Sequence, residues 1–460
     1  MRHFVLFILA LIPLLGMSAT SKAIPDTKFF EERIALEKKV TSLDCAGLSS
    51  TSLIKCLRIE VARSIAKEVP LSFFYDTMTV GTEKKKKTWK SLRREMALVV
   101  LDEEELEWKT IILDMPAGNE ELIMRVRTEA SPPFIVERLT GTSYNKMTFN
   151  VTQGEKQLLP YAAKWLRIPE GVSRTDIKKL QKESVPFLFM RTHSHMDDIS
   201  LAEAGLKFLT QEIERRLQAF SLQGISSKAK AGAVVTDFIR KEHMVNLILN
   251  EQVDPDHLYE KSWEGFFVDR RHPLLYEPNR TVLIDFFTNG LDAYRYTCSK
   301  AKACGAFQFT NSSFVNEKGK IVLGTYDVVR INYPEAKLDP VFRRGVESFT
   351  NSLYAAVLLF DLELSSSNLP FWVREVIDKE ESIGFVFAVI AYNGGGGRAS
   401  NFARLLTKDK KYEHVIRDKK LFPWKELAGL LGKNKVMVRE TFGYMLKFWH
   451  NHHELFVPVK

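Results

Sequence analysis

The chain has 460 residues, of which 45% are hydrophobic and 27% are charged. This composition excludes a disordered protein, and the length allows two or three globular domains. The formal net charge of +9 is dispersed apart from the lysine run at residues 84–87. We interpret that run as a solvated surface or as an attraction to anionic envelope polymers, and we expect no nucleic-acid partner.

The first 23 residues have the features of a secretory signal peptide. Arg2 precedes an apolar run at residues 4–15, and the small side chains of Ser21 and Ala23 frame a cleavage site before Ile24. The apolar run is shorter than the about 20 residues that a membrane-spanning helix needs. We therefore expect a periplasmic or secreted protein with no integral membrane segment in its mature chain.

The chain contains four cysteines, an even number that suits an oxidising compartment. We expect the sequence-local pairs Cys45 with Cys56 and Cys298 with Cys304, with free buried thiols as the alternative. Neither spacing is the two-residue spacing of a structural zinc site.

The hydrophobic pattern predicts an α+β protein. Residues 24–70 and 176–255 carry apolar positions at helical spacing, and residues 71–175 contain short β-rich runs between charged or Pro/Gly turns. A Pro- and aromatic-rich connector at 254–280 marks the start of a last domain over 256–460.

Two histidines and a carboxylate alternate in the middle of the chain, at His193, His195 and Asp197. They resemble the metal motif of the metallo-β-lactamase fold, and such a set could hold zinc in a hydrolase. However, Asp198 stands where that motif has its last histidine. The competing interpretation is that Asp197 or Ser200 caps the helix that follows.

Three stretches of the last domain carry a second resemblance. Residues 305–310 read Gly-Ala-Phe-Gln-Phe-Thr, residues 391–397 read Ala-Tyr-Asn followed by four glycines, and residues 439–447 begin Arg-Glu-Thr-Phe-Gly-Tyr. In this order and at these separations, they resemble the motif set of the soluble lytic transglycosylases, which share their fold with goose-type lysozymes.

The resemblance implies a helical lysozyme-like domain that cleaves peptidoglycan glycan strands between N-acetylmuramic acid and N-acetylglucosamine, without a cofactor. It also implies a set of substrate-binding residues, which are Gln308, Tyr392, Asn393, Gly395, Glu440 and Tyr444. The glycine of the glutamine turn is expected because bulk there would push the backbone away from the sugar.

The catalytic acid of the family is a glutamate, usually eighteen residues before the glutamine, and here that position is Gly290. Two carboxylates are candidates for the missing acid. Asp292 lies nearby, and Glu347 lies on a stretch that resembles the central helix of the family. The alternative is a domain that kept the glycan site and lost the acid, and so binds peptidoglycan without cleaving it.

Overall fold

The computed structural model describes most of the chain beyond residue 44. The described residues are 45, 48, 50–80, 87–116, 124–140, 147–168, 171–190, 194–253, 272–299, 302–311, 314–315, 321–367, 369, 383–408 and 439–456. The expected signal peptide, the lysine run up to residue 86 and His193 lie outside them, as does the first part of the helical segment predicted over 24–70, up to residue 49 except for residues 45 and 48.

Strands dominate the first described part. Within the described residues, eight antiparallel strands form one sheet in the order β4-β3-β2-β7-β6-β5, with β1 also paired to β2 and β8 to β7. Their bounds are β1 (Phe73–Val80), β2 (Lys87–Asp102), β3 (Glu107–Pro116), β4 (Arg125–Val126), β5 (Phe134–Thr140), β6 (Thr148–Gln153), β7 (Lys156–Arg167) and β8 (Val185–Phe189).

The long central strand β2 is buried on both faces. Its successive side chains point to opposite sides, so Val99 and Leu101 join the core under helix α2 (Ser50–Glu68), while Leu98 and Val100 join a separate core on the other side. This explains why the sequence there is continuously apolar rather than alternating.

The sheet continues past the boundary predicted at residue 175. Helix α3 (Ile177–Glu183) leads into β8, which pairs with β7 through residues such as Phe189 opposite Ala163. Together, α2, the sheet and α3 form what we call the sheet module.

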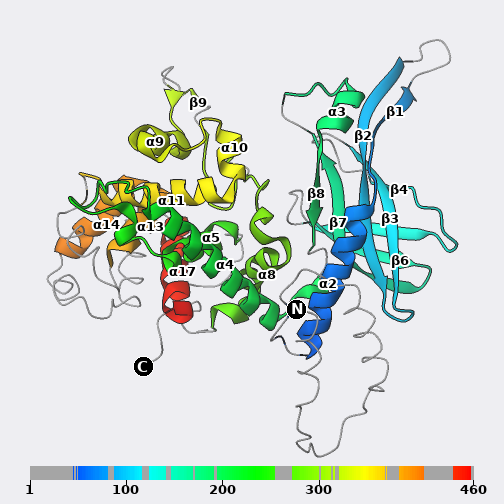
Figure 1. Cartoon of the computed structure of the whole chain (residues 1–460), viewed down its shortest axis with the longest axis horizontal. Helices are drawn as coiled ribbons and strands as arrows, with labels where there is room; N and C mark the ends of the chain where they lie inside the picture. The colour runs from blue at the N-terminus through cyan, green and yellow to red at the C-terminus, as the bar shows by residue number, and fades with distance from the viewer. Residues whose placement is uncertain are drawn as a thin grey trace, which may run out of the picture.

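Helices form the rest of the molecule, on the other side of Figure 1 from the strands. The α-helices are α4 (Ile199–Ser221), α5 (Lys241–Gln252), α8 (Glu277–Asn289), α9 (Thr325–Asn332), α10 (Phe342–Glu347), α11 (Phe349–Leu364), α13 (Ile383–Gly394), α14 (Gly396–Lys408) and α17 (Arg439–Phe456). Short 3-10 turns are η2 (Ser194–Met196), η3 (Val235–Asp237), η4 (Pro273–Leu275), η5 (Gly290–Asp292) and η6 (Pro334–Ala336), and a small hairpin pairs β9 (Phe314–Val315) with β10 (Ile321–Val322).

Helices α4 and α5 share one hydrophobic core with the helices that follow residue 256. Helix α5 packs against α4, α8 and α17, and α11 packs against α4, α9 and α13. The predicted boundary near residue 255 therefore does not coincide with a break in packing. We call this whole assembly the helical body.

The α+β class predicted from the sequence is confirmed. In the described part of the chain, no helix combines the length and the apolar character that crossing a membrane requires.

The closest approach between α4 and α8 depends on a glycine. A Cβ added at Gly205 would lie 2.0 Å from the carbonyl oxygen of Leu283. We expect Gly205→Ala to push the helices apart and to lower the free energy of unfolding by about 1–3 kcal/mol or more, as measured by denaturant titration. The matched control is Gly397→Ala, because that exposed helical glycine has no atom within 4 Å of an added Cβ. Equal stability of the two variants would contradict this account of the packing.

Candidate functional site

A carboxylate that the sequence analysis did not select lies among the three motif stretches. Glu251 stands in the last turn of α5, where it is half-buried, and the Tyr444 hydroxyl of α17 donates a hydrogen bond to its Oε1. The neighbouring Asn250 side chain donates to the main-chain oxygen of Tyr444 at 2.8 Å. Two adjacent residues of α5 thus fix the same residue of α17.

The next residue of α5 holds the glutamine turn. The Gln252 Nε2 donates to the carbonyl oxygens of Gly305 at 3.1 Å and of Ala306 at 2.9 Å. The Gln308 Nε2 donates to the same Gly305 oxygen at 2.8 Å. The turn carrying Gln308 is therefore fastened to the residue that follows Glu251 in the chain.

Gly305 is required in this turn for two reasons. Its φ is +80°, a backbone conformation that favours glycine, and an added Cβ would lie 2.5 Å from the carbonyl oxygen of Val346. The sequence predicted a glycine because of close approach to a sugar. In the structure, the close neighbour is the backbone at the end of α10.

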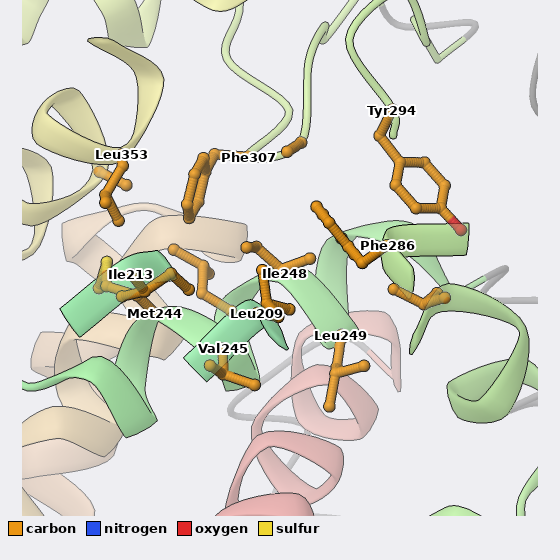
Figure 2. Close-up of a cluster of buried hydrophobic side chains, with 14 of the residues drawn as sticks. Leu209, Ile213, Met244, Val245, Ile248, Leu249, Phe286, Tyr294, Phe307 and Leu353 are labelled. Carbon is orange, nitrogen blue, oxygen red and sulfur yellow. The ribbon is translucent and has the colours of Figure 1, made fainter. Parts of the chain in front are cut away.

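The core below the turn ties it to α5. In Figure 2, the Phe307 ring lies among side chains of the helical body, near Leu353 of α11 and facing the α4 and α5 residues Leu209 and Ile248. Phe307 is fully buried, and burying a side chain of this size stabilises the fold by about 1.5–3 kcal/mol.

Tyr392, at the end of α13, also contacts the turn. Its hydroxyl donates to the carbonyl oxygen of Phe307, and its ring packs against Phe309 and Phe360 with centroids 6.3 Å and 5.9 Å away. Burial, and then the negative charge of Glu251, raise the pKa of Tyr392 well above its ordinary value. Burial and the same charge raise the pKa of Tyr444. Both hydroxyls therefore stay protonated and act as donors.

The end of α13 is tied to the start of α17 by a second contact. Thr441 donates from Oγ1 to the Asn393 Oδ1 at 2.8 Å and accepts a hydrogen bond from Arg398. Gly395, with φ +81°, turns the chain between α13 and α14. Glu440 lies in the first turn of α17, and its side chain lies outside the described residues.

A buried lysine completes the site. Lys447 lies on α17 one helical turn after Tyr444, is only 2% exposed, and donates from Nζ to the Leu249 carbonyl oxygen in the last turn of α5. Burial lowers the pKa of Lys447 well below its ordinary value, and the charge of Glu251 opposes that shift. The lysine thus satisfies a carbonyl that the helix end leaves unpaired, close to the Glu251 carboxylate.

The two carboxylates proposed from the sequence lie in different surroundings. The Asp292 side chain is 64% exposed and pairs with Arg295 at 2.9 Å. Glu347 binds Arg167 and Arg343. Burial acts to raise the pKa of Glu347, but the two arginines outweigh it and hold that pKa below its ordinary value. The arrangement of Glu347 therefore does not favour a proton donor, which needs a raised pKa.

The histidine stretch is also engaged in structural contacts. The His195 ring packs edge-on against Tyr161 with centroids 4.7 Å apart, and Asp197 pairs with Arg280 at 2.7 Å. The helix cap is Asp198, which accepts from the main-chain nitrogens of Ser200 and Leu201, so the predicted cap at Asp197 or Ser200 was wrong by one or two residues. Over the described ranges, no group of three or more His, Cys, Asp or Glu side chains is placed to hold a metal ion.

Both predicted disulfides are present. Cys45 bonds to Cys56 with an S–S distance of 2.02 Å, and Cys298 bonds to Cys304 at 2.08 Å. These bonds fit a protein of an oxidising compartment. The second one ends directly before Gly305 and so anchors the start of the glutamine turn.

The sequence analysis did not select Glu251, because it placed the catalytic acid by the family's spacing of eighteen residues before the glutamine. It precedes Gln308 by 57 residues, and helix α8 lies between them; the count of eighteen reaches Gly290, the residue that ends α8. A different feature of the sequence points to Glu251. A helix with apolar periodicity ends in Glu251-Gln252 just before the Pro-rich connector, which marks a carboxylate at a helix end next to a loop.

Comparisons with protein-family models, with curated proteins and with solved structures found no match for this chain.

Two stacked histidines join α5 to α17. Their lowered pKa values predict how the stability of the fold depends on pH. The rings of His243 and His452 lie 5.5 Å apart, His243 also stacks on Phe385, and the Asn246 amide lies 3.2 Å from the His452 ring nitrogen. Burial lowers the pKa of His243, and burial with the charges of His453 and Arg240 lowers the pKa of His452 to about 4.

Both histidines are therefore neutral in the folded protein and become protonated more readily in the unfolded chain. Their contribution to stability is complete above about pH 6.5 and is lost as the pH falls toward 4. We expect His452→Leu to reduce this loss by roughly 1–3 kcal/mol, measured as the melting temperature at pH 7 and pH 4.5. Equal acid sensitivity in the variant and the original protein would refute the assignment.

Proposed function

We propose that the protein is an exported peptidoglycan lytic transglycosylase with a lysozyme-like helical body, and that Glu251 is its catalytic acid. The observation that carries the proposal is the meeting of all three motif stretches around one carboxylate. Gln252 binds the glutamine turn, Tyr392 binds the same turn from α13, and Tyr444 of α17 binds Glu251.

The reaction needs a single carboxyl group that acts twice. In its protonated form, Glu251 donates a proton to the glycosidic oxygen as the bond to the anomeric carbon breaks. The resulting carboxylate then accepts the proton of the hydroxyl on the same N-acetylmuramic acid residue, and that hydroxyl oxygen bonds to the anomeric carbon to close an anhydro ring. No water is consumed, and the carboxyl group ends protonated as it began.

The surroundings of Glu251 suit this role. The carboxyl group is half-buried in the last turn of α5. The Tyr444 hydroxyl orients the group. Positioning by groups that are themselves held in place is what general acid catalysis requires.

The two other functions considered from the sequence are less well supported. A glycan-binding protein without catalysis was considered because no acid had been found, and Glu251 removes that reason. A zinc hydrolase would need Asp197 as a ligand, and that carboxylate is occupied by Arg280.

We expect Glu251→Gln to lower the rate of glycan cleavage by about 10²–10⁴-fold, because the amide cannot donate the acidic proton. The measurement is the release of anhydro-muropeptides from purified peptidoglycan, followed by mass spectrometry. Asp292→Asn is the matched control, since it makes the same change in an exposed carboxylate, and it should stay within twofold of the original protein.

Three outcomes would count against the proposal. Undiminished cleavage by Glu251→Gln would remove Glu251 as the acid. Loss of cleavage in Asp292→Asn would restore the residue proposed from the sequence. Peptidoglycan binding with no anhydro product from the original protein would support a non-catalytic protein.

A further inference from the structure

A pocket of about 470 Å³ lies on the helical body, and two of its lining residues, Tyr296 and Glu347, contact the sheet module. Its wall includes the Cys298–Cys304 disulfide, Val346 at the end of α10, and apolar side chains such as Phe342. Charged side chains also line it, and they are Arg295, Lys302, Asp327, Arg343 and Glu347.

The acidic groups of this pocket are already neutralised. Glu347 is paired with Arg343 at 2.9 Å and with Arg167 of β7, and Asp327 is paired with Arg330 at 3.2 Å. Arg343 is thereby also engaged. The two remaining cations of the wall are not paired with a carboxylate of the pocket: Arg295 pairs with Asp292 outside it, and Lys302 forms no ion pair with a described residue.

Arg295 and Lys302 have unused hydrogen-bonding capacity. The Arg295 Nε is buried and has no hydrogen-bond acceptor in the described part of the chain, and the ion pair of this arginine is with the exposed Asp292. Lys302 is exposed and forms no ion pair with any described residue. The Arg295 side chain is 40% exposed, so its accessible guanidinium nitrogens, like the Lys302 ammonium group, can donate hydrogen bonds to a ligand.

The pocket adjoins the proposed catalytic site. Cys304 in its wall is followed by Gly305, whose carbonyl oxygen accepts from Gln252, the residue after Glu251. Val346 in its wall supplies the carbonyl oxygen against which Gly305 packs. A ligand in the pocket would therefore lie beside Cys304 and Val346, the two pocket residues that adjoin the glutamine turn.

Contacts with the sheet module hold one aromatic residue of the pocket wall in place. Tyr296, which also lines the pocket, lies 3.6 Å beneath the Arg167 guanidinium and packs edge-on against Phe187 of β8 at 5.0 Å. Because β7 and β8 fix this tyrosine, the module gives the pocket a rigid aromatic wall beside its two available cations.

We propose that this pocket binds a carboxylate of the stem peptide carried by the glycan strand, through Arg295 and Lys302. The inference rests on the proposed function, because it assigns the peptide portion of the same substrate. Guanidinium groups bind carboxylates through paired, charge-assisted hydrogen bonds. The volume is far larger than a single ion needs, and the ring of Tyr296 with Phe342 offers contact to the aliphatic part of a peptide.

The test is isothermal titration calorimetry with a free tetrapeptide of stem-peptide composition, compared with the same peptide whose carboxylates are amidated. We expect the free peptide to bind the original protein and the amidated one not to bind. Arg295→Met combined with Lys302→Met should weaken binding about tenfold or more. Arg404→Met, an exposed arginine on α14, is the matched control and should bind as the original protein does. Melting temperatures of all variants check that each is folded.

Glu251→Gln separates this inference from the proposed function, since it should bind the peptide normally while cleaving no glycan. The inference is overturned if the free peptide does not bind, if the amidated peptide binds equally well, or if the double variant binds like the control. Peptide binding lost in the double variant, in a protein with no transglycosylase activity, would leave the pocket assignment standing and the enzyme assignment refuted.

Discussion

The end of helix α5 is the constraint on which the rest of the site depends. Three successive residues there act on two partners: Asn250 and Glu251 bind Tyr444 of α17, and Gln252 binds the glutamine turn. Helix α5 is itself held by α4, α8 and α17, so the position of the carboxylate follows from the packing of the whole helical body. A shift of α5 along its axis would break all of these hydrogen bonds together.

The contact between α5 and α17 includes charged and polar side chains whose burial costs free energy. Lys447 is buried with a single main-chain acceptor, and burying a cation is unfavourable unless it is paired. Such departures from a purely apolar core are expected where a site is built, because function requires charges at fixed positions. The neutral His243 and His452 pair adds a further polar element to the same α5–α17 contact.

The sequence predicted the helical and strand-rich regions and both disulfides. It did not predict which distant segments of the chain pack against one another. Helical periodicity located α4 and α5, and the cysteine spacing gave both bonds correctly. The sheet was extended to β8 by pairing with β7, and strand pairing between distant segments leaves no local signal. Glu251 could not be found by counting, because a chain can place a whole helix, here α8, between two residues that meet in space. The three motif stretches that carried the resemblance do lie together, which their order in the chain suggested without being able to prove.

The most direct measurement is a crystal structure of the Glu251→Gln variant with a bound glycan fragment that carries its stem peptide. The account predicts that the glycosidic oxygen lies within hydrogen-bonding distance, about 2.6–3.2 Å, of the side chain at position 251, next to the turn that carries Gln308. A glycan bound elsewhere on the protein, or a side chain at position 251 directed away from Tyr444 and the turn, would contradict it.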